Sequence, residues 1–238
     1  MNKIKKTQFL KWFFIQLRSI LKEPNDFFKQ KQFQKFSSKS VWFGVVSLCV
    51  GLGGQSLIEI ILLNWGEEIF QASPQNFMEI MKILLPQSDA NFLHVLYVLK
   101  MQKQISLILL PFIAFSSVYL FAGISHLIIR GLKLRPHENA NYENTLQLVA
   151  FSQAPMFFSF IPFFASIASF WCVVLLLKGI KSLYYGGLIL KFIAVLVPGF
   201  FIKLMWASSL EMMASSLAND IFDSNIKIKS NITNYKKQ

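Results

Sequence analysis

Four long apolar runs, separated by shorter polar or Pro-containing stretches, set the pattern of the chain. They cover about residues 41–65, 104–129, 145–177 and 188–206. A helix rises 1.5 Å per residue, so about 20 apolar residues are enough to cross 30 Å of hydrocarbon. The first, second and last runs therefore each predict one membrane span. In the first run, Gly51, Gly54 and other small residues predict a surface on which a second helix packs closely.

The third run contains no charged residue, and as one helix it would be about 50 Å long. That length exceeds one crossing and falls slightly short of two. Pro155 and Pro162 interrupt the run, which predicts two short helices joined by a tight turn near Pro162. Two full crossings and a re-entrant hairpin both fit this pattern.

The pattern as a whole predicts an all-α, polytopic membrane protein with about five membrane-spanning helices. The expected spans are about 41–65, 104–130, 144–161, 162–180 and 188–207. They form a membrane domain, 41–210, that includes a helical extracytoplasmic cap at 66–103. A basic cytoplasmic segment, 1–40, precedes this domain, and a polar tail, 211–238, follows it with its last part, 225–238, loosely ordered.

Residues 8–22 have the spacing of an amphipathic helix that ends just before Pro24. An apolar stripe runs along one side, basic residues lie off the stripe, and an aromatic residue suits the headgroup boundary. These residues are Phe9, Phe13 and Leu17 for the stripe, Lys11 and Arg18 for the basic positions, and Trp12 for the boundary. This pattern fits two interpretations. Either the helix lies on the membrane surface and contacts anionic lipids, or it packs on the rest of the protein.

Composition strengthens the membrane interpretation. Hydrophobic residues make up 54% of the chain and charged residues 15%, and there are 25 Phe. One soluble core does not hold so many large apolar side chains at this length. Cys49 and Cys172 both lie in apolar runs and cannot form a disulfide framework. We attribute the net charge of +12 to interaction with a membrane surface, so no nucleic-acid partner is expected.

The basic residues predict an orientation, because Lys and Arg gather on the cytoplasmic side of short loops. With five spans and a cytoplasmic N-terminus, that side holds sixteen Lys and Arg and the opposite side seven, with Lys203 inside a span. The basic linkers at 130–135 and 178–191 then lie on the same side. This requires an even number of crossings between them.

Candidate catalytic and metal-binding patterns are weak. Ser125 and His126 are neighbours, and adjacent helical residues point about 100° apart, so they do not form a nucleophile–base pair. His94, His126 and His137 lack the spacing of metal ligands. The sequence therefore predicts a protein that is not an enzyme and has no cofactor.

Polar residues inside apolar runs mark two candidate sites. Ser152 and Gln153 stand beside Pro155, and the three predict an intramembrane cleft. Glu59 and Lys203 lie at matching depths in the first and last spans. They either form an intramembrane ion pair or extend separately to the outer surface.

Three segments resemble the bacterial branch of the Yip family (Ypt-interacting proteins). They are Leu21-Lys22-Glu23-Pro24-Asn25-Asp26-Phe27-Phe28, the stretch from Tyr142-Glu143-Asn144-Thr145-Leu146 to Val149-Ala150-Phe151-Ser152-Gln153-Ala154-Pro155, and Trp171 with 175–179. The resemblance implies five spans, a cytoplasmic N-terminus and a role in membrane organisation or trafficking in a bacterial cytoplasmic (inner) membrane. The eukaryotic Asp-Leu-Tyr-Gly-Pro motif is absent, so the resemblance does not extend to small GTPases.

The sequence thus predicts a non-enzymatic scaffold in the lipid bilayer that binds lipids, a second copy of itself or another membrane protein. The alternative is a small transporter or an accessory subunit of a transport complex. A transporter concentrates polar residues near the midplane and often has internal repeats. Ser152 and Gln153 are the concentrated candidates, and the sequence has no evident repeat.

Overall fold

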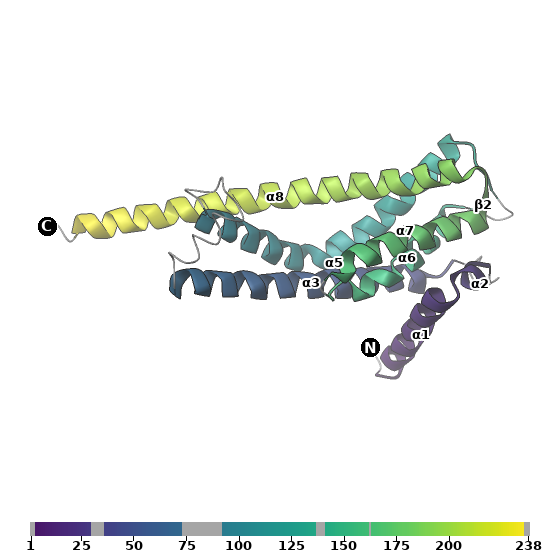
Figure 1. Cartoon of the computed structure of the whole chain (residues 1–238), viewed down its shortest axis with the longest axis horizontal. Helices are drawn as coiled ribbons and strands as arrows, with labels where there is room; N and C mark the ends of the chain where they lie inside the picture. The colour runs from purple at the N-terminus through teal and green to yellow at the C-terminus, as the bar shows by residue number, and fades with distance from the viewer. Residues whose placement is uncertain (1–2, 30–35, 73–91, 137–140, 162, 236–238) are drawn as a thin grey trace. The chain divides into compact units, whose positions relative to one another are not determined.

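The structure is a computed structural model that describes residues 3–29, 36–72, 92–136, 141–161 and 163–235 (Figure 1). Within these ranges it consists of helices and one two-residue antiparallel pair of strands. The elements are α1 (Lys3–Lys22), α2 (Pro24–Lys29), α3 (Ser38–Ala72), α5 (Phe92–Gly131), β1 (Arg135–Pro136), α6 (Tyr142–Ser152), the 3-10 helix η2 (Ala154–Phe158), α7 (Phe164–Leu183), β2 (Tyr184–Tyr185) and α8 (Leu188–Tyr235). As predicted, α1 ends just before Pro24.

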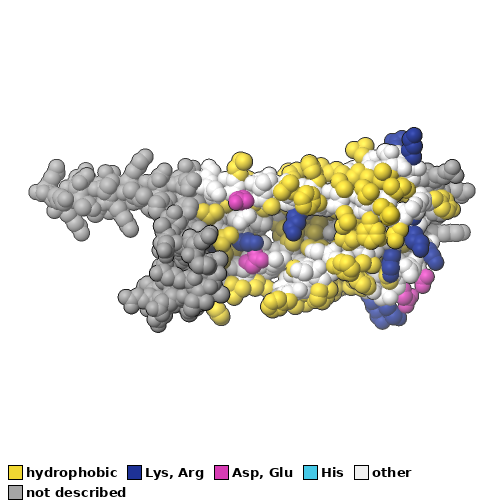
Figure 2. All heavy atoms as spheres, turned by 45° about the horizontal axis from the view of Figure 1, so that its top comes forward, with side chains coloured by type: hydrophobic (Ala, Val, Ile, Leu, Met, Phe, Trp, Pro, Cys, Tyr) yellow, Lys and Arg dark blue, Asp and Glu magenta, His cyan; other side chains and the backbone are white. Residues whose placement is uncertain are grey.

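Four helices in the described part of the chain are long and apolar enough to cross a membrane. They are Ser38–Trp65, Val98–Gly131, Phe164–Leu183 and Leu188–Ser216. Only 28–33% of each apolar window is buried, and hydrophobic side chains cover much of the face seen in Figure 2. Such faces suit contact with lipid. The predicted all-α, polytopic membrane fold is confirmed, but the count of five spans is not.

The described residues do not give five spans, because the first part of the third apolar run forms a short helix that is buried in the protein rather than exposed to lipid. α6 has 11 residues and is about 16 Å long, roughly half of a crossing. Its residues from Asn144 to Ser152 are all buried in the protein. The helix breaks at Gln153, and η2 continues the chain to Phe158. α6 is therefore a core helix, and α7 is the longer partner in this hairpin.

The strand pair holds together the two ends of the hairpin that α6, η2 and α7 form. β1 follows α5, β2 follows α7, and the two pair antiparallel with Arg135 opposite Tyr185. The linkers before α6 and after α7 therefore lie together. This agrees with the even number of crossings expected from the charge pattern, and it holds for two crossings and for a re-entrant hairpin alike.

The chain divides into two compact units, one formed by residues 1–55 and 110–204 and the other by 56–109 and 205–238. The hydrophobic core lies in the first unit, and glycines let its helices approach α6 closely. A Cβ on Gly44 of α3 would lie 2.8 Å from Cα of Ala150, and one on Gly179 of α7 would lie 2.5 Å from Leu148. Both distances are too short for any larger residue.

The small-residue surface predicted in the first span is in contact with the segment after α6. A Cβ on Gly51 would collide with the carbonyl oxygen of Met156 and the hydroxyl of Ser159, and one on Gly54 would lie 2.5 Å from Cβ of Phe160. The predicted close packing is therefore confirmed at Gly51 and Gly54, and it holds η2 and the following turn against α3.

α1 packs on the protein through the apolar stripe predicted from the sequence. Phe13, Leu17 and Ile20 are buried, and the Phe13 ring lies 4.7 Å from that of Phe43 and 5.6 Å from that of Phe157. Trp12 lies 6.2 Å from Phe43, edge to face. The apolar stripe of α1 therefore packs on the protein, which is the second of the two interpretations of this helix.

Other apolar side chains of α1 are exposed. Leu10, Phe14 and Ile15 are more than half exposed, and Lys11 and Arg18 lie between and beside them in the sequence. These side chains, rather than the predicted stripe, are the part of α1 that is open to a membrane surface.

The second unit extends two of the predicted spans. α5 begins at Phe92, so residues 92–103 of the predicted cap continue directly into the second span, while 73–91 lie outside the described residues. α8 remains helical to Tyr235. The helix of the last span therefore does not end where the composition becomes polar, and it includes 225–235 of the segment expected to be loosely ordered.

Candidate functional site

Pro155 breaks the third run and creates a polar corner at the end of α6. The backbone N–H of Gln153 bonds to the carbonyl of Ala150 (3.3 Å), so the carbonyl of Val149 is not used in the regular helical pattern. The Ser152 hydroxyl donates to that carbonyl at 2.7 Å, and the Gln153 amide lies 3.4 Å from it. The two polar side chains thus satisfy a backbone acceptor released by the break.

A cavity of about 920 Å³ adjoins this corner within the first unit. Its walls are mostly apolar, and they come from α3, α5, α6, η2, α7 and α8. The polar side chains of the lining are Ser117, Ser152, Gln153, Ser169 and Lys203. The volume is in the range of pockets that hold small organic ligands, about 300–1,000 Å³.

The three residues predicted to form one cleft line two cavities. Ser152 and Gln153 line the large cavity, whereas Pro155 lines a separate apolar cavity of about 280 Å³ between α1, η2 and α7. The proline causes the break but faces away from the polar corner. Lys203, singled out in the sequence for its depth, lines the large cavity together with Gln153. Nothing in the linear pattern indicates that these two residues share a cavity.

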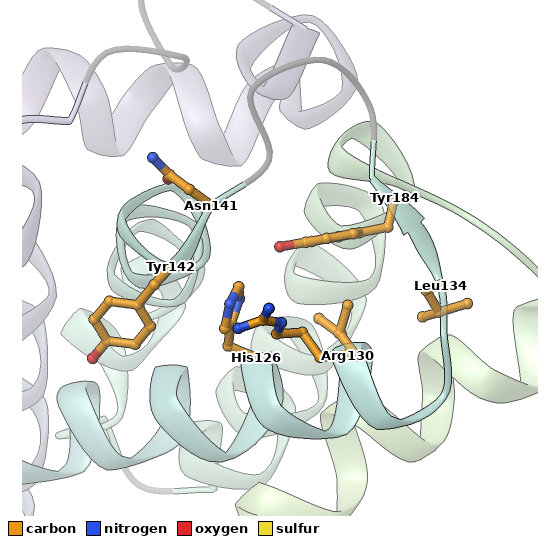
Figure 3. A pocket seen from close by; sticks show the side chains of 7 residues that line it. His126, Arg130, Leu134, Asn141, Tyr142 and Tyr184 are labelled. Carbon is orange, nitrogen blue, oxygen red and sulfur yellow. The ribbon is translucent and has the colours of Figure 1, made fainter.

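A second pocket, the Arg130 pocket, has a volume of about 600 Å³ and lies where α5 ends and α6 begins. Figure 3 shows Arg130, His126 and the hydroxyl of Tyr184 directed toward its centre, with Tyr142 and Asn141 at its rim. Ile129 and Leu134 complete the lining. This pocket shares no lining residue with the large cavity.

A buried hydroxyl, that of Thr145, holds two side chains of this pocket in position. It donates to the carbonyl of Asn141 at 3.2 Å and lies 2.9 Å from the Tyr184 hydroxyl and 3.3 Å from Nδ1 of His126. A hydroxyl has one proton, so we infer that Tyr184 and Nδ1–H of His126 donate to Thr145. Nε2 of His126 then carries a lone pair and can accept a hydrogen bond from a molecule in the pocket.

Both tyrosines of the pocket are uncharged at neutral pH. Burial raises the pKa of Tyr184, although its hydrogen bond with Thr145 opposes the shift. Burial also raises the pKa of Tyr142, and Tyr119 adds to the effect. An anion entering the pocket therefore meets neutral phenols and the cationic Arg130.

Comparison of the chain with models of protein families, with curated proteins and with solved structures finds no match.

The part of the chain that is described contains no group of three or more His, Cys, Asp or Glu side chains that could hold a metal ion. Ser125 is buried and its hydroxyl has no hydrogen-bond partner, whereas its neighbour His126 contacts Thr145. Ser125 and His126 therefore do not form a nucleophile–base pair, as their helical spacing predicts.

Glu59 forms an ion pair within the second unit. Its carboxylate lies 2.6 Å from the amine of Lys103, and about two thirds of each side chain is buried. The sequence suggests Lys203 as the partner, because depth was measured from the start of each predicted span. Lys103 was assigned to the cap, yet α5 begins before it, so Lys103 lies on the same continuous helix as the second span.

Proposed function

We propose that this protein is a non-enzymatic, Yip-type scaffold of a bacterial cytoplasmic membrane, and that it binds a membrane lipid in the cavity beside Gln153. The observation that carries the proposal is the cavity itself, with about 920 Å³ of space, mostly apolar walls and a few polar side chains. The apolar walls suit an acyl chain, since each buried CH₂ contributes about 0.8 kcal/mol. Ser152, Gln153 and Lys203 suit the polar ester and headgroup region.

Residues that carry the Yip resemblance have structural roles that support a shared architecture. Pro24 begins α2, and Phe27 and Phe28 are buried in the core. The Ser152–Pro155 element forms the break between α6 and η2. The proposal includes a cytoplasmic N-terminus, for which the basic segment 1–40 is the support.

Anionic lipids are the proposed partner of α1. Its exposed apolar side chains are Leu10, Phe14 and Ile15, all more than half exposed, with Lys11 and Arg18 next to them in the sequence. Apolar residues flanked by basic ones suit the boundary between headgroups and acyl chains. A second copy of the chain or another membrane protein is a further proposed partner, because it could pack against the exposed apolar faces of the helices.

Filling the cavity is expected to remove the bound lipid. Val173 lines the cavity and Ile193 does not, so Val173→Phe narrows the site while Ile193→Phe adds the same ring to an exposed position. Lipids that remain with the protein after mild detergent extraction are counted by native mass spectrometry. We expect the Val173→Phe protein to retain at least about fivefold less lipid than the wild type, the cost of excluding a few CH₂ groups. Equal lipid content in both variants would contradict lipid binding at this site.

Transport is the second candidate function, because polar side chains from α5, α6, α7 and α8 converge on the cavity. Gln153→Cys in a protein whose Cys49 and Cys172 are replaced by Ser tests it. Transport requires the cavity to open to water, so a water-soluble thiol reagent should label Cys at this position from both sides of the membrane. We expect protection instead, because a lipid-filled cavity is closed to water. Labelling from both sides would favour the transporter.

A further inference from the structure

The Arg130 pocket lies at the end of a membrane span. Arg130 is in the last turn of α5 and directly before the end of the apolar span Val98–Gly131. The β1–β2 pair and the start of α6 close the same region. Tyr142 and Tyr184 line the pocket, and tyrosines concentrate at the level where hydrocarbon meets headgroups. The pocket is therefore at the depth of lipid headgroups.

The groups that point into the pocket suit an anion with several oxygens. Arg130, with its planar guanidinium, is exposed and directed to the centre of the pocket, toward which the side chains of His126 and Tyr184 are also directed (Figure 3). Because Tyr184 and His126 donate their protons to Thr145, Arg130 is the group that binds the anion. A guanidinium binds two phosphate oxygens at once in a fixed geometry. Among the described residues that line the pocket, none is acidic; Glu143, in the first turn of α6, is not among them.

The pocket is also preorganised. Thr145 is buried, and its hydroxyl is shared by Tyr184 at 2.9 Å and His126 at 3.3 Å. The His126 ring packs edge to face with that of Tyr142, with centroids 5.8 Å apart. The two side chains beside Arg130 are therefore already ordered when an anion binds, which lowers the entropic cost of binding.

We propose that the Arg130 pocket binds a phosphate-bearing anion, either the headgroup of an anionic phospholipid or a soluble phosphate. Basic pockets between membrane helices are the usual sites for such headgroups. Ile129 and Leu134 in the lining suit the glycerol and first acyl carbons of a lipid. This site goes beyond the proposed function, because it uses none of the residues of the large cavity.

The test uses the purified full-length protein in nonionic detergent and native mass spectrometry. The probes are phosphatidylglycerol, diacylglycerol with the same chains but no phosphate, and inorganic phosphate. Arg130→Gln removes the side chain that is proposed to bind the phosphate. Lys133→Gln is the matched control, because it removes one positive charge from the same linker at a residue outside the pocket. Each variant is also made in the Val173→Phe protein, in which the large cavity is filled.

We expect Arg130→Gln to weaken phosphatidylglycerol binding by about tenfold or more and Lys133→Gln by less than about twofold. Diacylglycerol binding should not depend on Arg130. Binding of inorganic phosphate with the same dependence on Arg130 would identify a soluble anion, whereas binding of the lipid alone would identify a headgroup.

Two results would overturn the proposal. Equal losses in Arg130→Gln and Lys133→Gln would mean that any surface charge attracts the lipid. Binding of neither phosphate compound, or of diacylglycerol as strongly as phosphatidylglycerol, would mean that the pocket does not recognise phosphate. An Arg130 effect that persists in the Val173→Phe protein separates this site from the large cavity, so the failure of one proposal leaves the other intact.

Discussion

Replacing Gly51 with Ala is expected to destabilise the protein strongly. The added Cβ would collide with the carbonyl oxygen of Met156 and the hydroxyl of Ser159, and a backbone atom cannot rotate away as a side chain can. α3 and η2 must then separate along their contact, which also disturbs Gln153 and the polar corner beside it. We expect a loss of about 3 kcal/mol, the upper end of the usual overpacking cost, measured as a lower melting temperature in detergent.

Gly123→Ala is the matched control for this change. Gly123 is also in the middle of an apolar helix, but an added Cβ there meets no atom within 4 Å. Ala is favoured over Gly inside a helix by about 0.5–1 kcal/mol, so the control should melt at the same temperature or slightly higher. Similar losses in both variants would mean that any Gly→Ala change disturbs these helices, and that close contact at Gly51 is not the cause.

The apolar spans and helix ends were predictable because they depend on local chemistry. Length and composition alone identify the helices that begin at Ser38 and Leu188 and the span that ends at Gly131. Pro24 follows the end of α1 and Pro155 follows the end of α6, as expected for a residue without a backbone N–H. The small-residue surface around Gly51 was also visible in the sequence, because close helix contact in a membrane has a strict size requirement.

What surrounds each apolar face was not predictable. Hydropathy does not distinguish a helix buried in protein from one exposed to lipid, because both environments are equally apolar. α6 is therefore read as a span from its uncharged sequence, although the structure buries it on all sides. The stripe of α1 has the same ambiguity, since Phe13 and Leu17 fit a lipid surface and a protein core alike.

Long-range partners were the other feature beyond the sequence. Thr145 and Tyr184 are 39 residues apart, and their hydrogen bond depends on the β1–β2 pair that follows two different helices. Neither residue stands out by itself, and in the sequence His126 has only Ser125 as a polar neighbour and no histidine at the spacing of a metal ligand. The partner of Glu59 similarly depends on the register between helices, which matching depth in two predicted spans does not determine. The Arg130 pocket therefore emerges only when the chain is folded.

Leu17→Ala is expected to destabilise the protein much more than Leu10→Ala, although the two residues belong to the same helix. Leu17 is 5% exposed and Leu10 is 55% exposed. Removing a buried Leu side chain costs about 2–5 kcal/mol through lost burial and the cavity left behind, while an exposed one costs less than about 0.5 kcal/mol in helix interiors. Helix propensity changes equally in both variants, so it cancels in the comparison.

The two variants are compared by thermal unfolding in detergent, with the five Trp residues as fluorescent probes, and then in anionic vesicles. Packing of α1 on the core predicts a large loss for Leu17→Ala in both media. A membrane-surface helix without core contacts would instead give small losses for both variants in detergent, because the detergent covers both faces. In vesicles such a helix would detach most readily after Leu17→Ala, since Leu17 would then be its lipid-facing residue. The size of the Leu17 effect in detergent therefore decides which surface the apolar stripe of α1 contacts, and leaves Leu10, Phe14 and Ile15 as the residues to vary when lipid contact is tested.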